Sequence, residues 1–261
     1  MSARSYTTLL VEAVPPLTTL TLNRPERRNA IGPAMVNELL YALDDAFADN
    51  QTRCVVITGA GTTFCAGGDF AQMAGGADAA ALPVRGDYAD LLRVMMRAPK
   101  PVVARVNGHA MGGGLGVVAA STFAIASSDA KLGTPEVDVG LFPMMIMAIL
   151  SRLMPRRRLL EMMLLGQRLT AQEAVGAGLL NRAVPAADLD TAVLELTTAI
   201  AGKSPTALRL GLEAFADQDD LDLASALPLL RERLAAILAT DDAAEGLSAF
   251  LQKRPPRWTG H

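Results

Sequence analysis

Glycine gathers in the stretch NGHAMGGGLGVVAAS at residues 107–121, where Gly112 to Gly114 and Gly116 precede a run of small apolar residues. The apolar run predicts a helix, so the glycines would occupy its first turn. Backbone N–H groups in that turn have no partner within the helix, and the helix dipole adds about half a positive charge there. The stretch is therefore suited to hold an anion, or an oxygen atom that becomes negative during a reaction.

A second glycine-rich loop, GAGTTFCAGGDF at residues 59–70, contains Gly67 and Gly68. Each loop follows a short apolar run that predicts a buried strand, at 54–58 and at 101–106. Two such loops can each direct one N–H group at a single carbonyl oxygen, which is the arrangement of an oxyanion hole. Glycine-rich turns also occur where a crossover only needs space, so both interpretations remain open from composition alone.

The pattern G-x-G-x-x-A, from Gly114 to Ala119, offers an alternative because it is typical of dinucleotide binding. It follows a predicted strand, and Asp129 lies at a suitable distance along the chain to contact a ribose. In that fold, however, the glycines directly follow the first strand of the sheet. Here the residues NGHAM separate the predicted strand from Gly112, which disfavours a nicotinamide-dependent enzyme.

The best candidate for acid–base chemistry is Glu136, in the stretch KLGTPEVDVGLF. It follows Pro135 and is flanked by Leu132, Val137 and Leu141. Burial among apolar side chains would raise the pKa of the carboxyl group toward the range in which it works as a general base. The alternative interpretation is an acid on the surface, at the start of a helix.

Other common catalytic sets find little support. Neither histidine, His109 or His261, comes with a nucleophile-elbow motif that would complete a Ser-His-Asp arrangement. Cys54 and Cys65 lack Cys-x-x-Cys spacing, so we expect free thiols and no metal site. The arginine-rich stretch at 155–163 is expected to form the solvated face of a helix.

The composition indicates a globular protein with no attraction for polyanions. The chain has 261 residues, of which 51% are hydrophobic and 20% charged, with a net charge of −3 and a pI near 5.5. We therefore expect no nucleic-acid partner. The N-terminus has no signal-peptide pattern and the longest apolar run is too short for a membrane span, so we expect a cytoplasmic protein without membrane contact.

Strand and helix patterns alternate along the first 200 residues, which predicts an α/β fold with parallel strands and helical crossovers. We place a boundary near residue 200, between a core at 1–200 that carries the site and a helical region at 201–261. The predicted strands lie at 7–13, 17–22, 54–58, 101–106, 123–127 and 179–184. The predicted helices lie at 33–49, 87–98, 144–165 with a break at Pro155, 205–217, 221–239 and 241–252. One more helix opens at the glycine run, and another follows a capping box of Thr170 and Glu173.

Six stretches together resemble the enoyl-CoA hydratase/isomerase (crotonase) family, in that family's order and over nearly the whole chain. The resemblance implies a crotonase-like spiral of repeated ββα units, followed by a C-terminal helical trimerisation region. It also implies an acyl-CoA thioester as ligand, no cofactor besides the coenzyme A of the substrate, and self-association as a homotrimer or a dimer of trimers. The stretches are LNRPERRNAI (22–31), FCAGGDF (64–70), KPVVARVNGHAMGGGLG (100–116), GTPEVDVGLFP (133–143), GQRLTAQEAVGAGLLNRAV (166–184) and GLSAFLQKR (246–254).

The resemblance assigns roles to individual residues. It implies that the N–H groups of Gly68 and Gly113 hold the thioester oxygen and that Glu136 is the acid–base group. It places Arg27 or Arg28 near the coenzyme A phosphates. Further residues implied to contact coenzyme A are Ala66, Gly67, Asp69 and Phe70 along the bent chain, and Phe250 and Lys253 from the C-terminal part of this chain or of a neighbouring subunit.

One position departs from the family's hydratases, which are expected to use two glutamates to hold and activate water. The second matches Glu136, but the first corresponds to Gly116. Losing a positioned acid–base group typically reduces a rate by ~10²–10⁴-fold, whereas moving a double bond requires only one base. The sequence therefore favours enoyl-CoA isomerisation, with hydration and acyl-CoA binding without turnover as alternatives, and it leaves open whether Asp138 replaces the missing acid.

Overall fold

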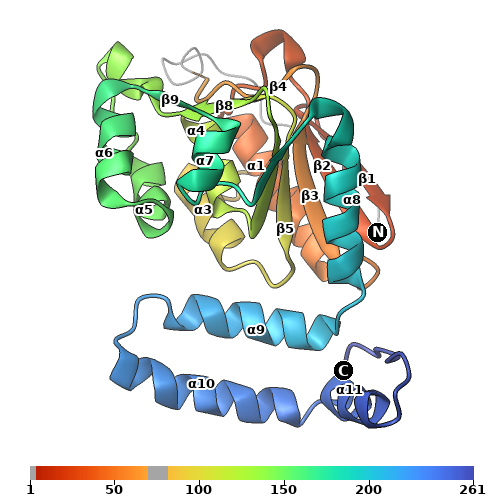
Figure 1. Cartoon of the computed structure of the whole chain (residues 1–261). Coiled ribbons are helices and arrows are strands. Elements are labelled where there is room, and N and C mark those ends of the chain that lie inside the picture. Colours follow the sequence, from red (N-terminus) through yellow and green to blue (C-terminus); the bar gives the residue numbers. More distant parts are fainter. Residues whose placement is uncertain (1–3, 70–81) are drawn as a thin grey trace.

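The computed structural model describes residues 4–69 and 82–261. Figure 1 shows a body of strands and helices, with the helices nearest the C-terminus extending below it. α8 (Leu189–Ala201) packs on the body, whereas α9 (Pro205–Gln218) belongs to the lower group. The boundary expected near residue 200 stays a prediction.

The larger sheet confirms the predicted parallel strands. Its first two strands are antiparallel and every other neighbouring pair is parallel. The middle strands are almost entirely buried because helices cover both faces, which explains their largely apolar sequences. In spatial order the six strands are β1 (Leu9–Val14), β2 (Leu17–Leu22), β3 (Cys54–Gly59), β5 (Val102–Val106), β7 (Phe123–Ser127) and β10 (Arg182–Val184).

A second sheet of four short strands was not among the elements predicted from periodicity. Three of its strands each follow a strand of the larger sheet after a short turn, so that pairs of strands repeat along the chain. This repeat confirms the ββα units that the family resemblance implies. In spatial order the strands are β4 (Thr63–Cys65), β6 (His109–Met111), β8 (Lys131–Gly133) and β9 (Arg168–Thr170).

Helices pack on both faces of the larger sheet. On one face, residues such as Leu20 and Ile57 join the core formed with α1 (Pro33–Ala48) and α4 (Gly113–Ala120). On the other, Val56 and Ile125 pack with the apolar face of α8. The remaining helices of the body are α3 (Tyr88–Met96), α5 (Met144–Leu153), α6 (Arg156–Leu165) and α7 (Ala171–Gly176), with 3₁₀ helices η1 (Pro25–Arg27), η2 (Pro135–Val139) and η3 (Ala186–Asp188).

Several helices begin where prolines and capping residues in the sequence predicted them to begin. Pro155 separates α5 from α6, and Thr170 with Glu173 forms the predicted capping box of α7. A second capping box, between Asp87 and Asp90, begins α3. Each capping side chain satisfies N–H groups that the first turn of a helix leaves without a partner.

The lower group contains α9, α10 (Leu223–Leu238) and α11 (Asp241–Leu251), which pack on one another. Large apolar side chains such as Leu223 and Phe250 are exposed on these helices. Among the described residues, no helix is both long and apolar enough to cross a membrane. Cys54 and Cys65 are free and buried.

Candidate active site

Glu136 lies in η2, directly after β8, and its carboxyl group is turned into the protein. The residue is half-buried, and its Oε2 atom is shielded from solvent with no hydrogen-bond partner among the described residues. Burial raises the pKa of this carboxyl group, and a hydrogen bond from its own backbone offsets only part of the rise. An acid in this state exchanges protons more readily near neutral pH than an exposed glutamate does.

Gly112 packs directly against this carboxyl group. A Cβ atom on Gly112 would lie 2.7 Å from Oε1 of Glu136, and the backbone there has φ +47°, which L side chains rarely adopt. The Gly112 N–H donates to the carbonyl of Gly133, at the end of β8 (2.9 Å). Glycine is therefore required here both by conformation and by the approach of Glu136.

The two glycine-rich turns lie side by side because both contact Ile31. Ile31 pairs with Gly68 in a parallel bridge, and a Cβ atom on Gly113 would lie 2.9 Å from Cγ2 of Ile31. The Ile31 N–H donates to the carbonyl of Gly67, and the Asp69 N–H donates to the carbonyl of Ile31, so Gly68 itself makes neither of these backbone bonds. Within residues 4–69 and 82–261, the N–H groups of Gly68 and Gly113 donate to no protein acceptor, as an oxyanion hole requires.

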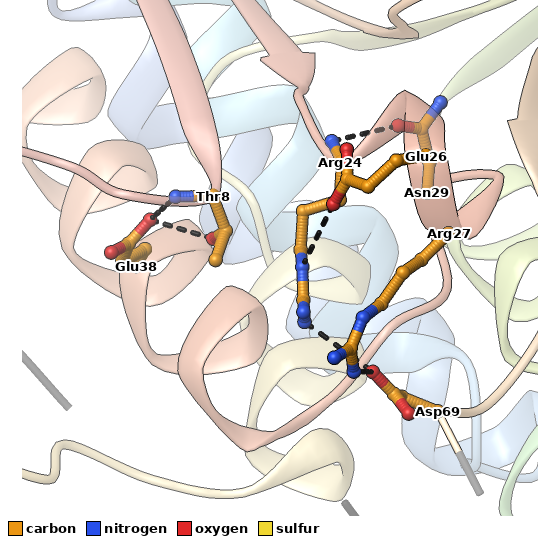
Figure 2. Close-up of polar contacts among 7 residues, drawn as sticks. All are labelled: Thr8, Arg24, Glu26, Arg27, Asn29, Glu38 and Asp69. Atoms are coloured by element: carbon orange, nitrogen blue, oxygen red, sulfur yellow. Dashed lines mark hydrogen bonds and ion pairs between the residues drawn. The ribbon is translucent and has the colours of Figure 1, made fainter. Parts of the chain in front are cut away.

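Two arginines converge on Asp69 at the end of the first glycine turn (Figure 2). Asp69 is buried, and its Oδ2 atom accepts hydrogen bonds from Arg24 (3.3 Å) and Arg27 (3.1 Å). Asn29 holds the arginine segment in place, since its Oδ1 accepts the backbone N–H of Arg24 (2.9 Å). Asp69 therefore anchors the arginine loop, and the Arg27 side chain remains 46% exposed beside the site.

The remaining sequence-predicted residues divide into two groups. Near the glycine turns, the Ala66 N–H donates to the carbonyl of Arg28 (3.0 Å), and the side chain of Arg28 is exposed. Phe70 lies outside the described residues. Phe250 and Lys253 are exposed at the end of α11, in the lower group of helices, so this single chain does not bring them to Glu136 (Figure 1).

Asp138 is directed away from the site. A Cβ atom on Gly166, at the end of α6, would lie 2.9 Å from the Asp138 carboxyl group, and Asp138 itself is exposed. Glu136 instead contacts Gly112, so the two acids face different neighbours. This placement gives Asp138 no position from which to replace a missing acid at Gly116.

Tyr88 is a site residue that sequence reasoning missed. Its hydroxyl donates to the carbonyl of Gly113 (2.5 Å), in the first turn of α4. Burial raises the pKa of Tyr88 well above its ordinary value, and the nearby Cys65 and Glu136 raise it further. The sequence shows only a tyrosine in an amphipathic helix, and no motif connects that helix with the glycines.

The sequence also matches a known family. The family model described as Enoyl-CoA hydratase/isomerase matches residues 15–261. The chain is 35% identical to 2,3-dehydroadipyl-CoA hydratase of Escherichia coli K12 over 243 residues, which are 92% of this chain and 94% of that protein. It is 34% identical to human enoyl-CoA hydratase domain-containing protein 3, mitochondrial, over 247 residues, covering 92% of this chain and 80% of the human one.

Solved structures show the same similarity. A crystal structure of an enoyl-CoA hydratase from Mycobacterium smegmatis superposes with a TM-score of 0.89 and 34% identity. The match covers 97% of this chain and 99% of that chain, including the helices at the C-terminus. The crotonase-like architecture implied by the resemblance is thereby confirmed.

Proposed function

The chain belongs to the enoyl-CoA hydratase/isomerase family, whose members act on acyl-CoA thioesters, and from this premise we propose that it moves the double bond of an enoyl-CoA. The observation that supports this most strongly is the state of Glu136. Its carboxyl group has one buried, unpartnered oxygen among the described residues and contacts the glycine turn that would bind the thioester.

In the proposed reaction, the N–H groups of Gly68 and Gly113 hold the thioester oxygen of a 3-enoyl-CoA. Glu136 removes a proton from C2, and the electron pair of that C–H bond forms a dienolate whose negative oxygen the two N–H groups stabilise. Glu136 then returns the proton to C4, so that the double bond lies between C2 and C3. The carboxyl group ends in the state in which it began.

The environment of Glu136 suits both halves of this cycle. Because burial raises the pKa of the carboxyl group, its charged form is a stronger base than an exposed glutamate. The same carboxyl group, once protonated, must give the proton back to carbon. The half-buried Glu136 carboxyl group can therefore both remove the proton from C2 and return it to C4.

Hydration of a 2-enoyl-CoA is the second candidate, and the names of the relatives favour it. Water addition uses one group to hold the attacking oxygen and one to deliver a proton to carbon. In the described part of the chain, Gly116 supplies no side chain and Asp138 faces Gly166, so Glu136 would have to do both. Acyl-CoA binding without turnover is the third candidate.

An absorbance assay with two substrates separates these candidates. We expect the purified protein to raise the conjugated-thioester absorbance of a 3-enoyl-CoA, and to lower that of a 2-enoyl-CoA far more slowly. Rapid loss of the 2-enoyl signal would instead assign a hydratase. Binding of both thioesters with no change in absorbance would leave a non-catalytic acyl-CoA protein.

The proposal includes self-association as a homotrimer or dimer of trimers. It is supported by the large apolar side chains exposed on the lower helices, such as Leu223, at 73% exposure, and Phe215, at 63%. A neighbouring subunit would also account for Phe250 and Lys253, which this chain alone leaves away from its glycine turns. A cytoplasmic location and the absence of a separate cofactor stay predictions from the sequence.

A further inference from the structure

Tyr88 and Ile146 fill the space beside Gly116. A Cβ atom on Gly116 would lie 2.1 Å from the Tyr88 hydroxyl and 2.3 Å from Cγ2 of Ile146. Both distances are well below any ordinary contact, so the position has no room for a single methyl group. Tyr88 comes from α3 and Ile146 from α5, and both elements pack on α4.

This filled space lies close to the candidate base. The Gly116 N–H donates to the carbonyl of Gly112 (3.0 Å), and Glu136 contacts Gly112. Tyr88 connects the two positions, since its hydroxyl would lie 2.1 Å from a Cβ atom on Gly116 and the charge of the nearby Glu136 contributes to the raised pKa of Tyr88. An acid at position 116 would therefore stand near Glu136.

Tyr88 is held in place by its hydrogen bond to the Gly113 carbonyl, and Ile146 is 3% exposed. Neither group offers a carboxylate, and the one polar atom, the Tyr88 hydroxyl, already donates its proton to the backbone. The volume next to Gly116 is therefore occupied by a phenol and an aliphatic side chain fixed by surrounding structure.

We propose that Tyr88 and Ile146 determine which reaction the site performs, by occupying the space in which a second acid or an attacking water would stand. This inference rests on the proposed function. With that space filled, no second acid or attacking water stands beside Gly116, so double-bond migration proceeds and water addition does not.

The test enlarges the space and measures the absolute kcat/KM for water addition to a 2-enoyl-CoA. In Y88F/I146A we expect this kcat/KM to rise at least ~10-fold, which corresponds to ~1.4 kcal/mol in the barrier. Tyr88→Phe alone removes one atom and should give a smaller gain. If Tyr88 and Ile146 only support the fold, both variants will lose water addition and isomerisation together.

A second test places a glutamate at position 116, with and without the enlarged space, and compares water addition by the two proteins. We expect Y88F/G116E/I146A to exceed G116E by at least ~10²-fold in kcat/KM for water addition, the effect of one positioned acid–base group. The matched control Y88F/G116E/I149A truncates a different buried residue of α5 and should gain nothing. Binding of a saturated acyl-CoA and cooperative thermal unfolding show that each variant is folded.

The outcomes separate the two proposals. A parent protein that does not isomerise a 3-enoyl-CoA contradicts the proposed function. A parent that isomerises, with Y88F and Y88F/I146A showing no gain in water addition, overturns the inference alone. Equal water addition by G116E and the triple variant overturns it as well, because the space would then not be the obstacle. If the triple variant does not fold, the variants without the added glutamate decide the question.

Discussion

Gly112 has no side chain, and this leaves room for the carboxyl group of Glu136. The left-handed backbone at Gly112 turns the chain into α4, and the carboxyl group of Glu136 occupies the volume that a Cβ atom would take. This arrangement leaves Oε2 of Glu136 buried and without a partner among the described residues. The fold therefore carries an unfavourable charge at the point where chemistry is proposed.

Removing that charge should stabilise the protein near neutral pH. Burial raises the pKa of Glu136 in the folded state above the ordinary value of 4.5, so stability falls as the pH rises from 4.5, and the full penalty applies above the folded pKa. Below 4.5 both states are protonated and the penalty disappears. We expect Glu136→Gln to raise Tm at pH 7, with a difference that shrinks toward zero as the pH falls below 4.5.

Thermal unfolding of Glu136→Gln and the parent across this pH range measures the effect. The exposed Glu12→Gln serves as a matched control and should change Tm little at any pH. A Glu136→Gln protein less stable than its parent at pH 7 would contradict the assigned environment of the carboxyl group.

At the scale of single residues, the sequence predicted the parts of the site that lie in local motifs. The glycines were recognised because glycine destabilises a helix and is rarely clustered at its start without a reason. Glu136 was recognised because apolar residues surround it in the sequence. Tyr88 was missed because its partner Gly113 lies 25 residues away and only the packing of α3 on α4 brings them together. Asp138 was undecided for the same reason, since its neighbour Gly166 lies on another element.

At the scale of elements, the strands of the larger sheet were predictable and those of the second sheet were not. A run such as CVVITG in β3 is long and wholly buried, so its composition marks it as a strand. β4, β6, β8 and β9 have three residues each, too few for a period to appear. They form because successive repeats of the spiral bring them into register, which is tertiary pairing rather than local preference.

The helix that carries Tyr88 depends on its first residues. The Asp87 side chain accepts hydrogen bonds from the N–H groups of Ala89 and Asp90, immediately beside Tyr88. We expect Asp87→Ala to lower the free energy of unfolding by ~1 kcal/mol through loss of the cap. Because the cap residue directly precedes Tyr88, whose hydroxyl donates to the Gly113 carbonyl, we expect the variant to lower kcat for isomerisation too.

Thr170→Ala removes the equivalent cap of α7 and provides the comparison, since Thr170 is exposed and, among the described residues, its side chain bonds only within its own capping box. Denaturant unfolding should give a similar loss for the two variants, while only Asp87→Ala changes kcat. Equal kinetic effects in both would show that the start of α3 has no particular connection with the site.

At the scale of the whole molecule, the chain after α11 folds back and joins the lower helices to the end of α8. The Trp258 side chain donates to the carbonyl of Gly202 (2.8 Å). Asp242 accepts hydrogen bonds from the Ser204 hydroxyl (2.7 Å) and from the N–H groups of Thr259 and Gly260 (2.8 and 3.1 Å). One carboxylate thus connects α9, α11 and the C-terminal segment.

Asp242→Ala should destabilise this region by about 1–3 kcal/mol, because it removes the acceptor of the buried Ser204 hydroxyl and of the Thr259 and Gly260 N–H groups. Burial acts to raise the pKa of Asp242, but hydrogen bonds from Ser204, Thr259 and Gly260 outweigh it and lower the pKa to about 2. A depressed pKa stabilises the folded state above the ordinary value of 3.8, and the gain is lost as the pH falls toward 2.

Urea unfolding at pH 7 and at acidic pH tests this, with the exposed Asp241→Ala as control. The cost of Asp242→Ala should exceed that of the control at pH 7 and diminish as the pH approaches 2. A pH-independent cost, or one equal to that of Asp241→Ala, would show that the carboxylate does not hold the segment.

The central claim is that Glu136 is the one acid–base group of an acyl-CoA isomerase, and Glu136→Gln tests it most directly. With a 3-enoyl-CoA as substrate, we expect the variant to bind the thioester as tightly as the parent but to lose at least ~10²-fold in kcat. Unchanged kcat in a folded Glu136→Gln protein that still binds the substrate would contradict the claim.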